Sequence, residues 1–222
     1  MTTFLTFKKF QTAEQAEELA VLLTEQGIPY FIEDNSSRVS DFIIGQDTIP
    51  GIHVKIAPGH FAKAQELLNR IAEKETAAVA SDHYLFSFRD DELLELLMEP
   101  DKWSEFDVQL SKRILQTRGI IMTPELENAF KAKRLKELGQ TEHMHMAWII
   151  TAYIMVIAGG FIGMLIGLTL WISKKTLPDG TSVYTYSKGQ RAQGKLITFM
   201  GIIMFAAYII LRVKWQMFSM RE

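Results

Sequence analysis

The carboxyl-terminal part of the chain contains two long apolar stretches. From Ala147 to Ile172, 26 consecutive residues carry no formal charge, and a helix of that length exceeds the roughly 30 Å hydrocarbon core of a bilayer. The second uncharged run, from Leu196 to Leu211, has only 16 residues, but the long basic side chains that flank it can reach the membrane surface. The pattern predicts a transmembrane domain over residues 141–222, in which a hairpin has spans at about 147–172 and 196–216.

Aromatic residues lie near the predicted ends of both spans. Trp and Tyr favour the two membrane–water interfaces, where one part of the ring system is apolar and another is wet. An antiparallel hairpin predicts Trp148 and Trp215 at one membrane face and Trp171, Tyr184 and Tyr186 at the other.

The first 80 residues have the pattern of an α+β domain. Phe4–Phe10 is apolar enough for a strand, and Thr12 with Gln15 forms the capping-box pattern of a helix that stops at Gly27. The elements expected afterwards are strands at 28–33 and 51–57, a short strand at 42–45, a helix opening at Pro58 and a closing strand near 84–88. This order predicts an antiparallel sheet with two helices on one face.

Residues 81–140 have the pattern of three helices, each with residues typical of a helix start and a helix end. Ser, Thr and Asp favour the position before a helix, whereas Pro and Gly favour its end or the residue after it. The expected boundaries are Asp90 to Pro100, Ser104 to Gly119, and Thr123 to Gly139. The segment is predicted to be a small all-α module beside the sheet, with a stalk or a partner-binding element as the alternative.

The amino-terminal domain also resembles a known family over roughly residues 4–75. The segments that carry the resemblance are Ala13-Glu14-Gln15-Ala16, Leu19, Gly27-Ile28-Pro29, Glu33-Asp34, Val54-Lys55-Ile56 and Ala64. They are similar to the small bacterial domain of prokaryotic signal-transducing proteins, a family of unknown function. The resemblance implies a ferredoxin-like fold and a regulatory role. The order of this domain, a helical segment and a membrane hairpin is also similar to uncharacterised membrane proteins of Bacteroidota.

Charge divides the chain at the same place as hydropathy. The whole chain has a net charge of −2, but residues 1–146 carry 16 basic and 24 acidic groups, whereas residues 147–222 carry 8 and 2. The absence of cysteine excludes thiol nucleophiles, iron–sulfur clusters and disulfides. The first half is therefore acidic and the second basic, which favours a bilayer as partner of the second and gives no indication of nucleic-acid binding.

Two signals bear on the orientation of the predicted hairpin, and they disagree. Five basic residues lie in the 173–195 connection, against seven outside it: Lys131, Lys133, Arg134, Lys136, Arg212, Lys214 and Arg221. This positive-inside bias is weak. The chain begins with the strand-like FLTFKKF, which lacks the pattern of a signal peptide, so export of about 146 folded residues is not expected. The prediction is a multi-pass protein of the inner (cytoplasmic) membrane with both termini in the cytoplasm.

Three glycines in the first predicted span are spaced by four residues. Gly159, Gly163 and Gly167 would lie on one face of a continuous helix, where small residues let another backbone approach closely. They are predicted to serve membrane helix packing. Either the second span packs there, or the face mediates self-association of two chains.

The best small-ligand candidate in the soluble half is a polar loop. Glu33, Asp34, Asn35 and Arg38 lie at and directly after the end of a predicted strand, and loops beside a rigid sheet often carry recognition. The alternative is an ordinary solvated loop. No catalytic motif, metal-ligand set or cofactor motif is complete in the chain, so no catalytic, cofactor-binding or metal-binding residues are predicted.

These patterns predict a membrane-anchored cytoplasmic regulatory or interaction module that is not an enzyme. It would act by sensing a small molecule or a protein partner. The alternative is an accessory or scaffold subunit of an inner-membrane complex, in which the soluble half only docks.

Overall fold

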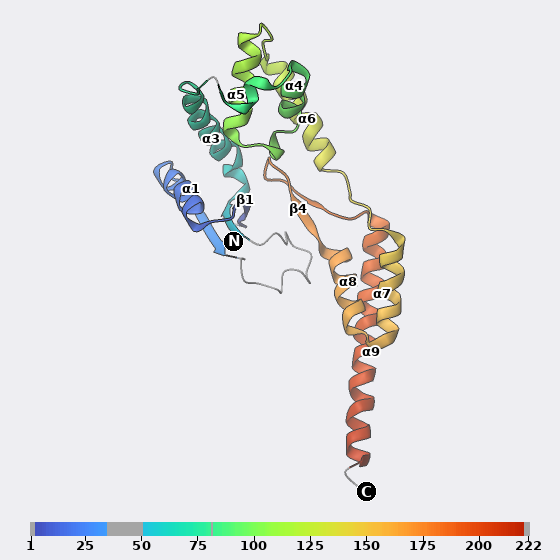
Figure 1. Ribbon diagram of the computed structural model, residues 1–222. Helices are drawn as coiled ribbons and strands as arrows, with labels where there is room; N and C mark the ends of the chain where they lie inside the picture. The colour runs from blue at the N-terminus through green and yellow to red at the C-terminus, as the bar shows by residue number, and fades with distance from the viewer. Residues whose placement is uncertain (1–2, 35–50, 81, 220–222) are drawn as a thin grey trace. The chain divides into compact units, whose positions relative to one another are not determined.

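The computed structural model describes residues 3–34, 51–80 and 82–219, which form an α+β structure that is mostly helical (Figure 1). The chain divides into two compact units. Unit 1 comprises Met1–Asp34, Gly51–Gly139 and Thr176–Thr181, and unit 2 includes Gln140–Lys175 and Ser182–Glu222. The α+β class expected from the sequence is confirmed. Asn35, Arg38 and the expected strand at 42–45 lie outside the described residues.

Unit 1 begins with a small antiparallel sheet. Its strands are β1 (Leu5–Phe10), β2 (Tyr30–Asp34) and β3 (Ile52–Ile56), and among the described residues their order is β1-β3-β2. Both neighbours pair with β3 in antiparallel register, and the β1–β3 register shifts between Thr6 and Lys8. Among the described strands of this sheet, the last in the chain, β3, therefore lies at the centre.

Two helices share a hydrophobic core with this sheet. They are α1 (Ala13–Glu25) and α3 (Phe61–Thr76), the latter preceded by a 3-10 turn at Pro58–His60. The helix predicted after Thr12 is confirmed, although the Thr12 side chain makes no capping hydrogen bond. The buried core residues are Ala16, Leu19, Leu23, Ile28, Val54, Ile56, Phe61 and Ala64. Alternation in β3 and helical spacing in α1 and α3 thus bring apolar faces together.

The prediction of a closing strand at 84–88 is wrong. Tyr84–Ser87 forms a 3-10 helix, in which the Phe86 N–H donates to the His83 carbonyl at 3.0 Å. Leu85 is fully buried, in the core of the helical module and not in that of the sheet. The alternation of Tyr84, Phe86 and Phe88 imitates a strand, but the local turn is favoured because it sends Leu85 to a different core. The ferredoxin-like assignment consequently lacks its closing strand in the part of the chain that the structure describes.

The helical module of unit 1 contains α4 (Asp90–Met98), α5 (Glu105–Thr117) and α6 (Pro124–Leu138), with a 3-10 turn at Pro100–Lys102. Ser104 and Thr123 cap α5 and α6 through their hydroxyl oxygens, as expected. The residue before α4 is Arg89, one position earlier than the expected cap Asp90. The buried core residues of the helical module are Leu85, Leu93, Leu96, Leu97, Leu110, Ile114 and Leu115.

Contacts within unit 1 join the sheet, the helical module and a later loop. The Lys8 ammonium on β1 pairs with the Glu105 carboxylate at the start of α5, which also accepts a hydrogen bond from Gln65 at 3.1 Å. The loop Thr176–Thr181 belongs to the same unit, and a Cβ added at its Gly180 would lie 2.9 Å from the Phe61 ring. The positive φ of 83° at Gly180 and this close approach both require glycine there.

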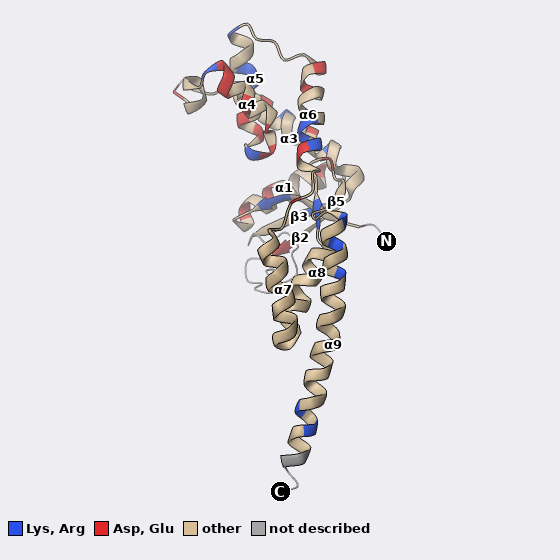
Figure 2. Cartoon of the chain, turned by 90° about the vertical axis from the view of Figure 1, so that its right-hand side faces the viewer, with Lys and Arg blue, Asp and Glu red and all other residues tan. Residues whose placement is uncertain are grey.

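Unit 2 is built from three apolar helices and a short hairpin. The helices are α7 (Met146–Gly159), α8 (Phe161–Ile172) and α9 (Lys188–Ser219), and the strands are β4 (Lys174–Thr176), whose last residue belongs to unit 1, and β5 (Ser182–Tyr184). Figure 2 shows that the charges of α9 lie toward its two ends, with an uncharged stretch between them. The small buried core contains Ile149, Ala152, Val156, Leu170 and Ile197.

The expectation of one continuous helix over 147–172 is wrong. The chain reverses at Gly160, whose φ is 78°, so that α8 runs back beside α7. A Cβ added at Gly163 would lie 2.7 Å from the carbonyl oxygen of Ala152, although in a straight helix those residues would be about 16 Å apart. Among the described residues, α9 is the one helix long and apolar enough to cross a membrane.

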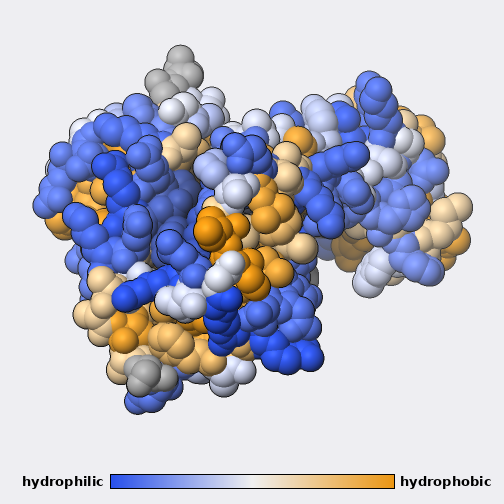
Figure 3. Space-filling model, turned by 90° about the horizontal axis from the view of Figure 1, so that it is seen from above, coloured by the Kyte–Doolittle hydropathy of each residue, from blue (hydrophilic) through white to orange (hydrophobic). Residues whose placement is uncertain are grey.

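Polar side chains cover most of the molecular face that is seen from above in Figure 3, with hydrophobic side chains in smaller groups. Several apolar side chains of unit 2 are strongly exposed. Ile157 is 73% exposed, and Ile203 and Leu211 are each 67% exposed. Because such contiguous apolar surface is unusual on water-soluble monomers, unit 2 has a surface suited to a nonpolar environment.

Candidate functional site

The described residues of the expected ligand loop lie at the end of β2. Glu33 forms an ion pair with Lys55 of the neighbouring strand β3, and Asp34 lies opposite Ile52 in the sheet register. Asn35 and Arg38 are outside the described residues, so the loop as a binding site stays a prediction. Glu33 itself acts as a cross-strand charge partner.

The three glycines expected on one helix face have different surroundings. Gly163 faces α7, where an added Cβ would lie 2.5 Å from the Val156 side chain. Gly167 faces α9, where an added Cβ would lie 2.7 Å from the amide nitrogen of Thr198 and 2.8 Å from the carbonyl oxygen of Gly194. Gly159 has no neighbouring atom within 4 Å of an added Cβ. The reversal at Gly160 separates Gly159 from the other two, so they do not form one stripe.

Positive side chains and aromatic rings gather at one end of the unit 2 helices. The guanidinium carbon of Arg191 lies 3.2 Å from the centre of the Tyr184 ring, and Lys174 Nζ lies 4.9 Å from the same centre. Lys195 Nζ lies 5.7 Å from the centre of the Trp171 rings. These are cation–π distances. We call these five residues the cation–aromatic cluster.

The cations of this cluster have no carboxylate partner among the described residues. Arg191 donates from Nε to the carbonyl oxygen of Trp171 at 3.4 Å, whereas the ion pair of unit 2 lies nearby between Lys175 and Glu142, at 3.2 Å. Two buried polar atoms at this end of the helices, Ser173 Oγ and Gln190 Oε1, also have no hydrogen-bond partner in the part of the chain that the structure describes. The end of the helices is therefore positively charged and incompletely paired.

The start of α7 lies at the same end of unit 2. The side-chain amide of Gln190 donates to the Met144 carbonyl at 2.8 Å, and the Glu142 N–H donates to the Thr185 carbonyl at 2.7 Å. Trp148, in the first turn of α7, is therefore at the same end as Trp171. The expected pairing of Trp148 with Trp215 at one end is wrong, because the chain reverses at Gly160 and brings the end of α8 back beside the start of α7.

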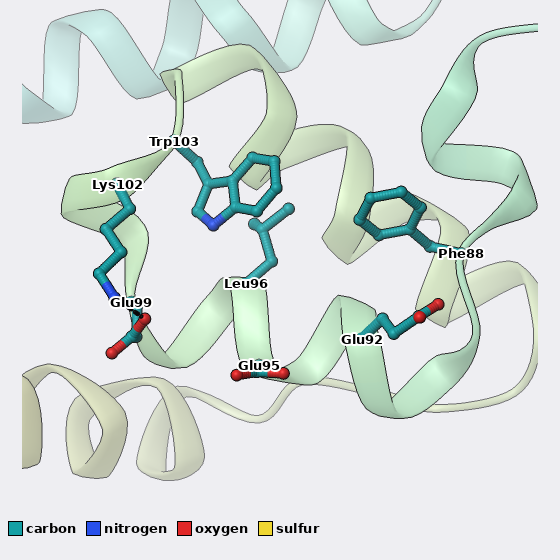
Figure 4. A pocket seen from close by; sticks show the side chains of 7 residues that line it. All are labelled: Phe88, Glu92, Glu95, Leu96, Glu99, Lys102 and Trp103. Carbon is teal, nitrogen blue, oxygen red and sulfur yellow. Dashed lines mark hydrogen bonds and ion pairs between the residues drawn. The ribbon is translucent and has the colours of Figure 1, made fainter.

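A second candidate lies in the helical module of unit 1, and we call it the α4 cleft (Figure 4). It has a volume of about 280 Å³. Its lining residues are Phe88, Glu92, Glu95, Leu96, Glu99, Lys102 and Trp103. The ring centres of Phe88 and Trp103 are 6.3 Å apart at an interplanar angle of 81°, so two aromatic walls meet edge to face above the α4 carboxylates.

The carboxylates of the α4 cleft are partly neutralised at one end. Glu99 accepts hydrogen bonds from Lys102 and from Arg134, the latter at 2.8 Å, and these partners hold its pKa below the usual value. Arg134 also binds Asp101 with two hydrogen bonds of 2.7 and 3.0 Å, which lower the pKa of Asp101. Glu95 has no ion pair within the described part of the chain. The free negative charge is therefore at the middle of the cleft.

Comparisons of this chain with protein-family models, with curated proteins and with solved structures gave no match. The residues in the part of the chain that the structure describes also contain no group of three or more His, Cys, Asp or Glu side chains placed to hold a metal ion.

Sequence reasoning missed both candidates for identifiable reasons. Glu92, Glu95 and Glu99 have helical spacing, but the sequence alone does not show that aromatic rings lie opposite them. The cation–aromatic cluster joins residues that are between 7 and 24 positions apart. The basic and aromatic residues of the 173–195 connection are visible in the sequence, but their pairing is not.

Proposed function

We propose that this protein is a membrane-anchored regulatory or interaction module that acts by binding and not by catalysis. The observation that carries the proposal is the apolar surface of unit 2, where exposed isoleucines and leucines surround helices that bury few of their own side chains. Helix α9 is the anchor. It has 32 residues, about 48 Å of helix, which exceeds the thickness of a hydrocarbon core.

In this proposal α7 and α8 enter the bilayer and return to the face from which they came. They have 14 and 12 residues, or about 21 and 18 Å of helix, so each is shorter than the roughly 30 Å core. Their reversal is supported at Gly160 by α9, where an added Cβ would lie 2.6 Å from the Gly201 carbonyl oxygen. A reversal inside the membrane is tolerated when protein covers its backbone.

With this topology, the basic residues lie mainly on one side of the membrane. If the hairpin returns, the 173–195 connection is on the same side as the segment before α7. Nine basic residues then lie on that side, Lys131, Lys133, Arg134, Lys136, Lys174, Lys175, Lys188, Arg191 and Lys195, against three after the span, Arg212, Lys214 and Arg221. Because basic residues mark the cytoplasmic side, unit 1 is proposed to be cytoplasmic and the carboxyl terminus to lie across the membrane.

Single cysteines test the anchor and its topology, because the natural chain has none. The variants Glu17→Cys, Ser182→Cys and Glu222→Cys are treated with a membrane-impermeant maleimide in intact cells and after permeabilisation. We expect intact cells to label only Glu222→Cys. The two-span topology with both termini in the cytoplasm predicts the opposite result, with label only at Ser182→Cys. Release of the protein from membranes by alkaline carbonate would reject the anchor itself.

The interaction part of the proposal is supported by the α4 cleft. Its aromatic walls and the carboxylate of Glu95 suit a positively charged organic group, since ring faces and carboxylates both attract cations. The resemblance of residues 4–75 to a signal-transducing family favours regulation through such binding. The alternative role, a scaffold subunit that only docks, needs no ligand in this cleft.

A thermal-shift measurement on the full chain in detergent tests ligand binding at the α4 cleft. We expect spermidine to raise the unfolding temperature and succinate, an organic anion, to leave it unchanged. Glu95→Gln should weaken the spermidine effect, whereas Glu17→Gln on the exposed face of α1 should not. An equal spermidine effect in both variants would mean that the cation acts on the general negative charge of the protein.

A further inference from the structure

We propose that the cation–aromatic cluster of unit 2 binds the headgroups of anionic phospholipids. This inference rests on the proposed membrane function and adds a lipid class and a binding site to it. The cluster consists of Lys174, Arg191 and Lys195 with the rings of Tyr184 and Trp171.

The first argument is the state of the Arg191 side chain. Its guanidinium lies against the Tyr184 ring and makes one hydrogen bond, from Nε to the Trp171 carbonyl oxygen. The ring contact orients the planar group, while its Nη1 and Nη2 atoms have no protein acceptor in the described residues. Arginine binds phosphate through pairs of parallel N–H donors, and an oriented guanidinium loses less conformational entropy on binding.

The second argument is local charge. In the described part of unit 2 the acidic side chain is Glu142, and Lys175 already pairs with it. The cations of the cluster therefore remain uncompensated, and the first turn of α9 contains no acidic residue that would neutralise them. A phosphate group would supply the missing negative charge at the positive end of the α9 dipole.

The third argument identifies a lipid as the source of that phosphate. Apolar side chains directly next to the cluster are exposed, namely Ile172 at 38%, Leu196 at 53% and Phe199 at 49%. A lipid presents both chemistries together, with a charged headgroup beside an acyl chain, whereas free phosphate or a nucleotide leaves those apolar groups uncovered. Tyr and Trp rings at this level also match the preference of these residues for the headgroup region.

The test uses the full chain in nanodiscs in which phosphatidylglycerol progressively replaces phosphatidylcholine. Native mass spectrometry counts the lipids of each class that stay bound after release. We expect the natural protein to retain phosphatidylglycerol in preference, and less so when NaCl rises from about 0.05 M to about 0.5 M. Each basic side chain near an anionic surface changes association by about fivefold, so Lys174→Gln with Arg191→Gln and Lys195→Gln should remove the preference.

A matched control removes the same charge from unit 1. Lys131→Gln with Lys133→Gln and Lys136→Gln changes three exposed lysines of α6 and should leave the lipid preference unchanged. Arg191→Lys, which keeps the charge but not the paired donors, should lower the preference by less than Arg191→Gln. Equal loss in the α6 control, or an unchanged preference in the cluster variant, would overturn the inference.

Two further outcomes separate this inference from the proposed function. Failure of the protein to enter nanodiscs of pure phosphatidylcholine would reject the membrane anchor as well. Entry without any preference for phosphatidylglycerol would reject only the lipid site. If inorganic phosphate displaces bound phosphatidylglycerol at millimolar concentration, the cluster is a general anion site and the assignment to lipid is wrong.

Discussion

Unit 1 and unit 2 place their charges and their close contacts in different ways. In unit 1 cations meet carboxylates, as Arg134 does with Glu99 and Asp101, and the core of the helical module is filled mainly by leucines. In unit 2 cations lie on aromatic rings, and backbones meet at glycines such as Gly167. Water drives leucines together in a soluble core, but lipid does not, so helices in a membrane need close packing instead. Under the membrane function proposed above, this difference would follow from the solvent around each unit.

The largest expected effect is the loss of a core leucine in unit 1. Leu115 is fully buried, and Leu115→Ala should lower the free energy of unfolding of this unit by about 2–5 kcal/mol through lost burial and a cavity. Hydrogen exchange of the full chain in detergent, followed by mass spectrometry, measures each unit separately. Amides of α9 should keep their protection. Equal loss of protection in both units would show that they unfold together and would break the comparison.

The corresponding change in unit 2 adds a side chain at a glycine contact. Gly167→Leu should destabilise the helices by about 1–3 kcal/mol or more, because the new atoms meet backbone atoms of α9 that have no room to move. The matched control is Gly159→Leu, which meets open space and should be nearly neutral. Hydrogen exchange of α8 and α9 measures the difference. Similar results for the two variants would contradict packing by close approach at Gly167.

A smaller effect is expected from the Arg134 ion pairs. The Arg134 side chain is 12% exposed, and Arg134→Gln should cost unit 1 about 1–2 kcal/mol, since it removes the ion pair of Asp101 and leaves Glu99 with Lys102 alone. Arg70→Gln is the control. Its ion pair with Glu66 is exposed and 3.9 Å long, so its loss should cost at most about 0.5 kcal/mol. Urea titration followed by hydrogen exchange compares the two variants. An equal loss of unfolding free energy in both would contradict the difference between the half-buried and the exposed ion pair.

The smallest effect concerns pH. Burial alone would raise the pKa of Glu105, but the charge of Lys8 and hydrogen bonds from Lys8 and Gln65 lower it below its ordinary value of 4.5. A lowered pKa in the folded state means that its stabilisation is complete above the unfolded value and is lost as pH falls through the folded value.

We therefore expect unit 1 to lose up to about 1 kcal/mol from this pair as the pH falls below about 4.5, and Glu105→Gln to reduce the pH dependence. Thermal unfolding as a function of pH measures this change. Glu17→Gln is the control because Glu17 is exposed on α1 and should leave the pH profile unaltered. A profile of Glu105→Gln that matches the natural protein would contradict the assigned role of the pair.

The sequence predicted features whose causes are local. Ser104 and Thr123 cap their helices with their own hydroxyls, and Gly27 ends α1 because the chain there adopts positive φ. The reversal at Gly160 was not predictable in this way. Glycine is common in membrane helices, and only the close approach of α9 at Gly201 stabilises a turn at that point.

The candidate sites also depend on contacts between residues that are not neighbours in the sequence. Trp171 and Arg191 are brought together by the course of a hairpin, and nothing in their sequence neighbourhood specifies it. The α4 cleft needs the 3-10 turn at Tyr84–Ser87 to place Phe88 opposite Trp103. The alternation of apolar residues at 84–88 is typical of a strand, so the sequence did not indicate this turn.

The six residues Thr176–Thr181 have a practical consequence for anyone who wishes to express unit 1 alone. They belong to unit 1 although they follow α7 and α8 in the chain, and in this loop Leu177 lies near Gly139 and Gly180 lies against Phe61. A fragment that stops at residue 139 would uncover the ring of Phe61, which is only 2% exposed in the full chain. Such a fragment would be prone to aggregate, whereas a version that rejoins the loop through a short linker would keep the ring covered.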